Sequence, residues 1–536
     1  MSKEGKNATN FVERKTNAMY AKVDIWQNRI ARLLFILMCC GVPLFLTPRT
    51  YLNLPSAKYV FFLVSFFLCL LMALIVWGYR STRNPRLGPK DKLDIADIAI
   101  LAFALVTILS TILSPFWEHM NILIGLQPLN GRTGRYDGAI TQLAYIAMFF
   151  IISRWYKPRL KDFAWLSIVS IVISIIGILQ FFGMDFLGLW PNHMPAHFRE
   201  NFFDIHIRTT LGNTNTASLY LTLHVLVTGF LFIRKKSKWQ PLWLASSGIN
   251  FWMFLIAGAD SGIVGMGVAM VFAIPFIIEG RKTLGRTLIL AGTWSGAFVL
   301  HRFFFEVIAL PVRDASSLLP FIGGVAVLAA VGWLLCFKAK EIEPNAAPKW
   351  KLGVVLIIVV IAAGFLGVEF LGRPDYDGIG SGVLYEAREI LHGRIRDEFG
   401  TNRVYIWRIG LSVVEHNPLI GTGPDTFGFA FPFLYQFHFG QWYDNAHNEY
   451  IQYLVTHGII GLIAYLVFAL AVVVKSVRKA FSDPIMMAVL GAVVAYLAQA
   501  FFNISHPIAS QLLWIFCGIL MSRRCNEDGR FDWDEK

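Results

Sequence analysis

Residues 352–371 read LGVVLIIVVIAAGFLGVEFL, an apolar run of twenty residues that contains one charge, Glu369. A helix rises about 1.5 Å per residue, so roughly 20 apolar residues cross the hydrocarbon core of a bilayer. The run therefore predicts a membrane-spanning helix. Similar runs recur along the chain, and this repetition predicts a helical membrane protein.

Thirteen further runs are long enough, or nearly long enough, to cross a bilayer. They lie at about 30–48, 59–79, 94–114, 139–153, 161–183, 214–233, 242–258, 261–279, 287–309, 318–337, 452–474, 484–503 and 508–522. The runs at 139–153 and 508–522 are short and need a tilt or an extension to span. The expected fold is an all-α polytopic membrane protein with about fourteen transmembrane helices.

The composition of the 536 residues excludes most other classes of protein. Hydrophobic residues make up 56% and charged residues 15%, whereas a soluble domain has about 25% charged residues. A disordered chain has the opposite balance, and the glycine and cysteine contents exclude collagen-like and disulfide-rich scaffolds. The six cysteines lack metal-ligand spacing, so we expect them to pack as small apolar residues.

The basic residues predict the orientation of the chain. A net charge of +13 would suggest nucleic acid in a soluble protein, but here Lys and Arg concentrate in alternate loops, as cytoplasmic segments do. The basic segments are the N-terminus through Arg32, 80–92, 154–161, 234–238, 281–286, 338–351, 475–479 and the tail from Arg523; they hold 34 of the 48 Lys and Arg. We therefore expect both termini to be cytoplasmic and no nucleic-acid partner.

The apolar runs also predict how the chain is divided. The segments are a cytoplasmic N-terminus at 1–29, helices 1–11 at 30–371, an extracytoplasmic loop at 372–447, helices 12–14 at 448–522 and a cytoplasmic tail at 523–536. The first run follows a polar, basic segment, so it is expected to act as a signal-anchor. The 76-residue loop is too long to lack structure and is expected to hold a small subdomain. Nine of the twelve histidines lie in outer loops, which predicts that the chemistry occurs there.

Within the large loop, a helix is predicted to begin near Arg403. Its apolar residues recur at helical spacing: Val404, Trp407, Leu411 and Val414. Thr401 or Asn402 can cap its start, and Pro418 prevents its continuation. The pattern predicts an amphipathic helix on the outer membrane face, where Arg403 contacts either solvent and lipid headgroups or a ligand. The phenylalanine-rich segment 427–439 is either an interfacial aromatic belt or part of a site.

The segment 444–454 reads DNAHNEYIQYL and leads into the twelfth span. Asp444 or Asn445 can cap a helix that has His447 in its first turn. A helix N-terminus disfavours imidazolium and attracts phosphate, so a neutral His447 at this position suits general-base work. The alternative is a polar residue at the end of a membrane helix.

These motifs together resemble the outer-loop signature of the O-antigen ligase and O-antigen polymerase superfamily. The signature reads Arg403-x3-Trp407, Pro418-x2-Gly421-x-Gly423-x3-Phe427, His447-Asn448-Glu449-Tyr450 and Gly458-x2-Gly461. Two earlier stretches are similar to motifs of the same proteins: Arg135-Tyr136-Asp137-Gly138 and Arg208-Thr-Thr-Leu-Gly212-Asn213-Thr-Asn215-x-Ala217. The resemblance covers most of residues 115–465.

The resemblance implies a GT-C-like helical fold and a glycosyltransferase of a bacterial plasma membrane that needs neither a metal nor another cofactor. Such enzymes take a glycan from an undecaprenyl-diphosphate carrier in the membrane lipid and pass it to an acceptor hydroxyl on the outer face. The acceptor is a glycan, a lipid, a wall polymer or a protein. One position departs from the family, because Asp260 or Ser261 stands where its ligases commonly carry Arg.

The implied site is made of six residues. His447 is expected to act as the general base. Arg403, Arg208 and Arg135 are expected to bind the donor diphosphate, since guanidinium forks hold phosphate oxygens bidentately. Asn448 and Glu449 complete the expected substrate-binding set, and Glu449 is also a rival for the catalytic role.

Two other functions remain open. A lipid-linked oligosaccharide flippase also has about fourteen spans, but it would be expected to carry charges inside them, and these spans have few. A non-catalytic scaffold in envelope assembly would not need His447. A metal site at His193 and His197 is a weak alternative, because the pair lacks a third ligand.

Overall fold

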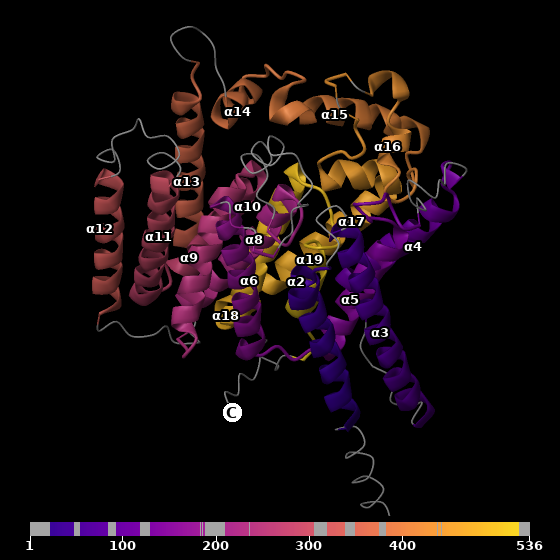
Figure 1. Cartoon of the computed structure of the whole chain (residues 1–536), viewed down its shortest axis with the longest axis horizontal. Helices are drawn as coiled ribbons and strands as arrows, with labels where there is room; N and C mark the ends of the chain where they lie inside the picture. Colours follow the sequence, from indigo (N-terminus) through magenta and orange to yellow (C-terminus); the bar gives the residue numbers. More distant parts are fainter. Residues whose placement is uncertain are drawn as a thin grey trace, which may run out of the picture.

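The computed structural model describes residues 22–47, 54–83, 93–117, 129–182, 184, 186–187, 209–234, 236–304, 319–337, 349–374, 382–436, 438–440 and 442–524. Within these ranges every regular element is a helix and there is no strand (Figure 1). The all-α prediction is confirmed. Arg208, His193, His197 and Cys525 lie outside the described residues.

Within the described residues, each of the fourteen predicted runs overlaps a helix. The candidate spans, by length and apolar composition, are nine in the described part of the chain: residues 22–44, α3 (Leu54–Arg83), α4 (Ile95–Ile112), α6 (Leu160–Phe181), α8 (Thr214–Arg234), α10 (Asp260–Ile277), α13 (Trp350–Leu371), α17 (Glu449–Ser482) and α18 (Pro484–Gln499). Shorter or less apolar helices cover the rest: α5 (Ala139–Trp155), α9 (Gln240–Ala257), α11 (Arg281–Arg302), α12 (Leu319–Cys336) and α19 (Gln511–Leu520). The count of fourteen spans and the GT-C-like arrangement stay predictions.

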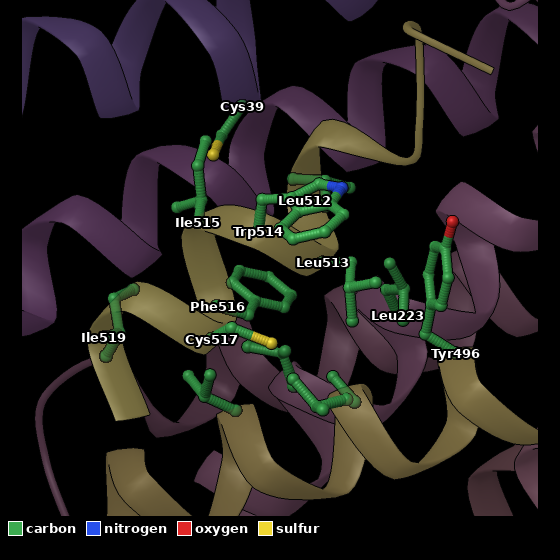
Figure 2. Close-up of a cluster of buried hydrophobic side chains, with 14 of the residues drawn as sticks. Cys39, Leu223, Tyr496, Leu512, Leu513, Trp514, Ile515, Phe516, Cys517 and Ile519 are labelled. Carbon is green, nitrogen blue, oxygen red and sulfur yellow. The ribbon is translucent and has the colours of Figure 1, made fainter. Parts of the chain in front are cut away.

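The core of the helical body surrounds α8, which is buried along almost its whole length and packs against α9 and α18. Figure 2 shows the neighbouring cluster on α19, where Trp514 and Cys517 lie among leucine and isoleucine side chains. The described cysteines are free, and Cys39, Cys69 and Cys517 are buried, so the packing role predicted for them is confirmed. By contrast, α13 is exposed along most of its length, as a lipid-facing helix would be.

The helical body has two ends (Figure 1). We call the end that carries α14 (Val383–Leu391), α15 (Phe399–Val413) and α16 (Phe427–Ala430) the loop side, and the opposite end, which carries residues 523–524, the tail side. The helices of the loop side form a hydrophobic cluster of their own, separate from the main core. Its buried members are Tyr405, Ile406, Ile409, Val413, Phe427, Phe431, Tyr443, Ala446 and Val455. Val455 of α17 belongs to this cluster, which therefore packs against that helix, while the predicted domain division and the subdomain at 372–447 stay predictions.

Two details of the predicted helix at 403–415 were wrong. Leu411 was placed on the apolar face but is exposed, and the buried face carries Tyr405, Ile406 and Ile409 instead. The neighbours on α16 and at residue 443 select that face, and sequence spacing does not reveal them. No side chain caps the helix start, because Thr401 and Asn402 have left-handed backbone angles at a kink.

Candidate functional site

A break in α17 fixes the position of the loop. Gly458 has φ 66° and ψ −173°, a conformation that is essentially restricted to glycine. The turn that begins at Pro418 docks on this break: the N–H of Ile459 donates to the Pro418 carbonyl oxygen at 2.8 Å. A Cβ atom on Gly421 would lie 2.3 Å from the carbonyl carbon of Thr456. The glycines of the recognised motif are therefore needed for two backbones to meet.

An ion-pair network joins this turn to the segment before α5. Arg135 Nε donates to Asp425 Oδ1 at 2.8 Å, and its Nη2 donates to the Asp444 backbone oxygen at 2.8 Å. Arg135 Nη1 lies 3.3 Å from Asp444 Oδ1. Arg132 donates its backbone N–H to Asp425 Oδ2 at 2.6 Å, and its side chain pairs with Asp444. Two arginines thus hold two carboxylates from segments about 300 positions away in the chain.

Burial and the neighbouring charges act in opposite directions on each pKa in this network. Burial alone would lower the pKa of Arg135, but Asp425, Asp444 and Asp137 outweigh it and raise that pKa. Burial raises the pKa of Asp425, although Arg135 opposes the rise. For Asp444, burial acts in the raising direction, but Arg135 and Arg132 prevail and lower its pKa. The pKa values of the two carboxylates are thus shifted in opposite directions, and the two arginines favour the ionised form of each.

The backbone around Arg135 is held in an unusual conformation by its neighbours. Tyr136 has φ 57°, stacks on Tyr59 with ring centroids 4.2 Å apart, and its hydroxyl lies 2.6 Å from Ser56 Oγ. Asp137 is buried and accepts a hydrogen bond from Ser505 Oγ at 3.1 Å. Non-glycine residues with positive φ persist only where surrounding contacts fix them. The segment is thus tied to α3 and to the turn before α19.

His447 is strained and lies just before α17. Its φ is 49°, and its backbone N–H donates to Asn445 Oδ1 at 2.7 Å. The capping residue is Asn448, whose Oδ1 accepts from the backbone N–H groups of Tyr450 and Ile451 at 2.9 and 3.1 Å. The prediction that Asp444 or Asn445 caps the helix with His447 in its first turn was therefore wrong.

The surroundings of His447 keep its imidazole neutral. Burial lowers its pKa to about 4, and the positive charges of Arg403 and Arg135 act in the same direction, whereas Asp444 opposes them. At neutral pH the ring therefore has a lone pair to accept a proton. This is the protonation state that a general base requires.

Arg403 begins the regular part of α15 and lies close enough to act on His447. Its Nη1 donates to the Gly400 carbonyl oxygen at 2.7 Å and to Thr401 Oγ1 at 2.8 Å. Its Nε is buried and has no hydrogen-bond partner within the described residues. Asp260 is one of two acidic residues whose charge acts on it. Arg403 thus makes no carboxylate ion pair in that part of the chain and retains a donor for a ligand.

A cavity of about 310 Å³ opens on the loop side, where the segments that carry Arg135 and His447 meet. Arg135, Arg132, Asp444 and His447 line it, and its other walls come from the start of α8 and from the turn before α19. Those wall residues include Leu211, Gly212, Asn213, Thr216, Ile504 and His506. The motif that follows Arg208 therefore reaches this cavity, although Arg208 itself is outside the described residues.

Asn448 and Glu449, predicted to bind substrate, are buried and make structural contacts. Asn448 caps α17, and Glu449 Oε1 accepts a hydrogen bond from Tyr496 of α18 at 2.6 Å. Neither residue is among those that line the cavity. Asn448 Nδ2 and Glu449 Oε2 are buried without a partner in the described part of the chain.

Sequence reasoning missed Arg132, Asp425 and the ion-pairing role of Asp444. One signal was available, because Arg132 precedes Arg135 by three positions in the same outer segment. No signal marked Asp425, which lies between a glycine-rich turn and a short helix and whose partner is 290 residues away.

Comparison with known proteins agrees with the motif-based resemblance. Residues 315–466 match the family model described as O-antigen ligase, which confirms the predicted similarity to that superfamily over this part of the chain. The matched part contains Arg403, His447 and Gly458. A search of curated proteins finds no match. The apolar helices indicate a multi-pass membrane protein, and the match shows that residues 315–466 are similar to the O-antigen ligase family.

Proposed function

We propose that this protein transfers a glycan from an undecaprenyl-diphosphate carrier to an acceptor hydroxyl at the outer face of a bacterial plasma membrane. One observation carries the proposal: a neutral His447 lines a loop-side cavity together with Arg132 and Arg135, which come from a segment more than 300 positions earlier in the chain. In this assignment both termini are cytoplasmic, and no metal or other cofactor takes part. The acceptor is a glycan, a lipid, a wall polymer or a protein.

His447 is the proposed general base. It accepts the proton of the acceptor hydroxyl while that oxygen forms a bond to the anomeric carbon of the donor glycan. The bond from that carbon to the diphosphate oxygen breaks, and undecaprenyl diphosphate leaves with the electron pair. Attack from the side opposite the leaving group inverts the anomeric centre. A positioned base of this kind contributes about 10²–10⁴-fold in rate.

Arginine side chains are proposed to receive the negative charge that develops on the leaving diphosphate. Arg403 is the strongest candidate, because its buried Nε lacks a hydrogen-bond partner among the described residues. Arg208 is proposed for the same role from its motif. Arg135 forms ion pairs with Asp425 and Asp444, so it contributes positive charge to the cavity wall and positions the loop. Preorganised charge facing a developing anion is often the largest catalytic contribution.

Donor binding would also raise the pKa of His447. The low pKa of His447 reflects burial and the neighbouring positive charges. A diphosphate in the cavity would add negative charge beside the imidazole, which favours imidazolium and raises that pKa. The bound donor would thus make His447 a stronger base in the complex than in the free enzyme.

The test uses the purified full-length protein in liposomes that contain an undecaprenyl-diphosphate glycan and a candidate acceptor. Transfer with stoichiometric release of undecaprenyl diphosphate is the expected result. Movement of the lipid-linked glycan across the bilayer without transfer would instead indicate a flippase. Absence of both reactions with every acceptor class would favour a scaffold.

A further inference from the structure

A second cavity lies beside the one that contains His447. It has a volume of about 150 Å³. Arg132, Arg135 and Asp444 line both cavities, so the ion-pair network forms a shared wall between them. His447 lines the larger cavity only, whereas Asp425, Phe429 and Trp442 line the smaller one only.

The lining of the smaller cavity combines an aromatic surface with charged hydrogen-bonding groups. Phe429 and Trp442 line it together with Asp425 and Asp444. Trp442 is 42% exposed, although it lies beside the buried Tyr443. A sugar ring presents C–H groups on one face, which pack on an aromatic ring, and hydroxyl groups at its edge, which donate to carboxylates. The cavity has room for one such ring.

The two ion pairs in the shared wall differ in exposure. The side chains of Arg135 and Asp425 are 8% and 0% exposed, so this pair is held inside the protein. Those of Arg132 and Asp444 are 36% and 33% exposed. A water-exposed ion pair is worth little free energy, whereas a buried pair is costly to separate. The Arg132–Asp444 pair is therefore the part of the wall that can open and join the two cavities.

We propose that the smaller cavity, with Trp442 as its stacking surface, binds the acceptor as a pyranose ring, and that the Arg132–Asp444 pair separates this ring from the donor cavity. The acceptor is then a glycan or a glycosylated molecule. This inference rests on the proposed function, because it names the acceptor class and locates it relative to His447.

Direct binding tests the sugar site without turnover. The full-length protein in detergent micelles is mixed with methyl glycosides of glucose, galactose, rhamnose and N-acetylglucosamine, and saturation transfer from protein to sugar protons is measured by NMR. At least one glycoside should bind to the unmodified protein and to Trp442→Tyr, which keeps an aromatic face. Trp442→Ala should abolish the signal. Phe433→Ala is the matched control, since Phe433 is 78% exposed and lies outside the cavity lining.

Acceptor kinetics provide the second measurement. Trp442→Ala should raise the KM for a glycan acceptor by about 10-fold or more and leave the KM for the lipid-linked donor unchanged, because the lost surface contacts only the acceptor. Normal glycan turnover with an unchanged acceptor KM would overturn the inference and leave the proposed function standing. Sugar binding that depends on Trp442, without any transfer, would support the sugar site and contradict the proposed function. Binding of no glycoside to the unmodified protein would also overturn the inference.

Discussion

The loop side and the tail side of the molecule each contain a carboxylate that is paired with two arginines, but the two ion-pair groups differ in their surroundings. On the tail side, Asp97 Oδ2 lies between Arg154 and Arg523, at 2.7 and 2.6 Å. On the loop side, Asp444 lies between Arg132 and Arg135. In each case one carboxylate pairs with two arginines, and at least one of these arginines lies more than 300 positions away in the chain.

The surroundings of the two carboxylates differ. The Asp97 side chain is 1% exposed and belongs to the regular helix α4, whereas Asp444 is 33% exposed and faces two cavities. The backbone differs as well. All non-glycine residues with positive φ in the described ranges belong to loop-side segments: Tyr136, Thr209, Thr401, Asn402, Asp425 and His447.

This difference separates a structural role from a candidate functional one. Strained backbone is retained where the surrounding structure over-determines it, and it is frequent at active sites and ligand clamps. The tail-side pairs tie α4, α5 and the C-terminal segment together without such strain. The loop-side pairs hold strained segments around open space, so changes there should affect catalysis, whereas tail-side changes should affect stability alone.

The largest effect should come from His447→Ala. Loss of the proposed base should lower the transfer rate by about 10²–10⁴-fold, while donor binding and thermal stability stay near those of the unmodified protein. The measurement is turnover of purified protein, together with donor affinity and melting temperature. His416→Ala, an exposed histidine of the same loop, is the matched control and should retain full activity. Near-normal turnover of the His447 variant would remove this residue from the mechanism.

The next effect concerns Arg403, whose buried Nε has no hydrogen-bond partner among the described residues. Arg403→Ala should lower transfer by about 10²-fold, in the range found when one preorganised transition-state donor is removed. Arg403→Lys keeps the charge but loses the planar fork, so it should remain impaired. Arg408→Ala is the control on the same helix, because Arg408 is exposed and pairs with Asp397. An Arg403→Ala protein with unchanged donor affinity and turnover would refute the assignment.

The sequence predicted the helices well because apolar runs are local features. Each predicted run overlaps a helix in the described residues, and the motif-based resemblance led to Arg135 and His447, which the structure brings to one cavity. The details that failed depend on distant partners. Leu411 fits the apolar spacing of α15, but Phe427 and Tyr443 select a different face. Asp425 has no local pattern, and only the approach of Arg135 makes it part of the site.

Replacing one carboxylate on each side tests the comparison most directly. Asp425→Asn removes the buried carboxylate that pairs with Arg135, and Asp97→Asn removes the buried carboxylate that pairs with the partly buried Arg154 and Arg523. Each should therefore cost up to about 3 kcal/mol of stability. The two variants should differ in the activity of the protein that remains folded. Asp97→Asn should keep the KM and kcat of the unmodified protein, whereas Asp425→Asn should raise the KM as Arg135 shifts. Melting temperature and kinetics measured on the same preparations distinguish these results, and equal kinetic losses in both variants would contradict the division of roles.

The smallest effect is a shift of the acid limb of the pH–rate profile, which changes on the loop side should alter and changes on the tail side should not. Burial and the charges of Arg403 and Arg135 disfavour imidazolium, so His447 loses its proton with a pKa of about 4 instead of its usual 6.5. The profile of kcat/KM reports the free enzyme and should therefore fall on the acid side near pH 4. The profile of kcat reports the complex with donor, where the diphosphate favours imidazolium, and its acid limb should lie about one pH unit or more higher.

In Asp97→Asn both limbs should stay where they are, because that residue lies on the tail side. Initial transfer rates measured across the acid range, with subsaturating and saturating donor, give both profiles. Coincident limbs would show that the bound diphosphate does not act on the residue that titrates.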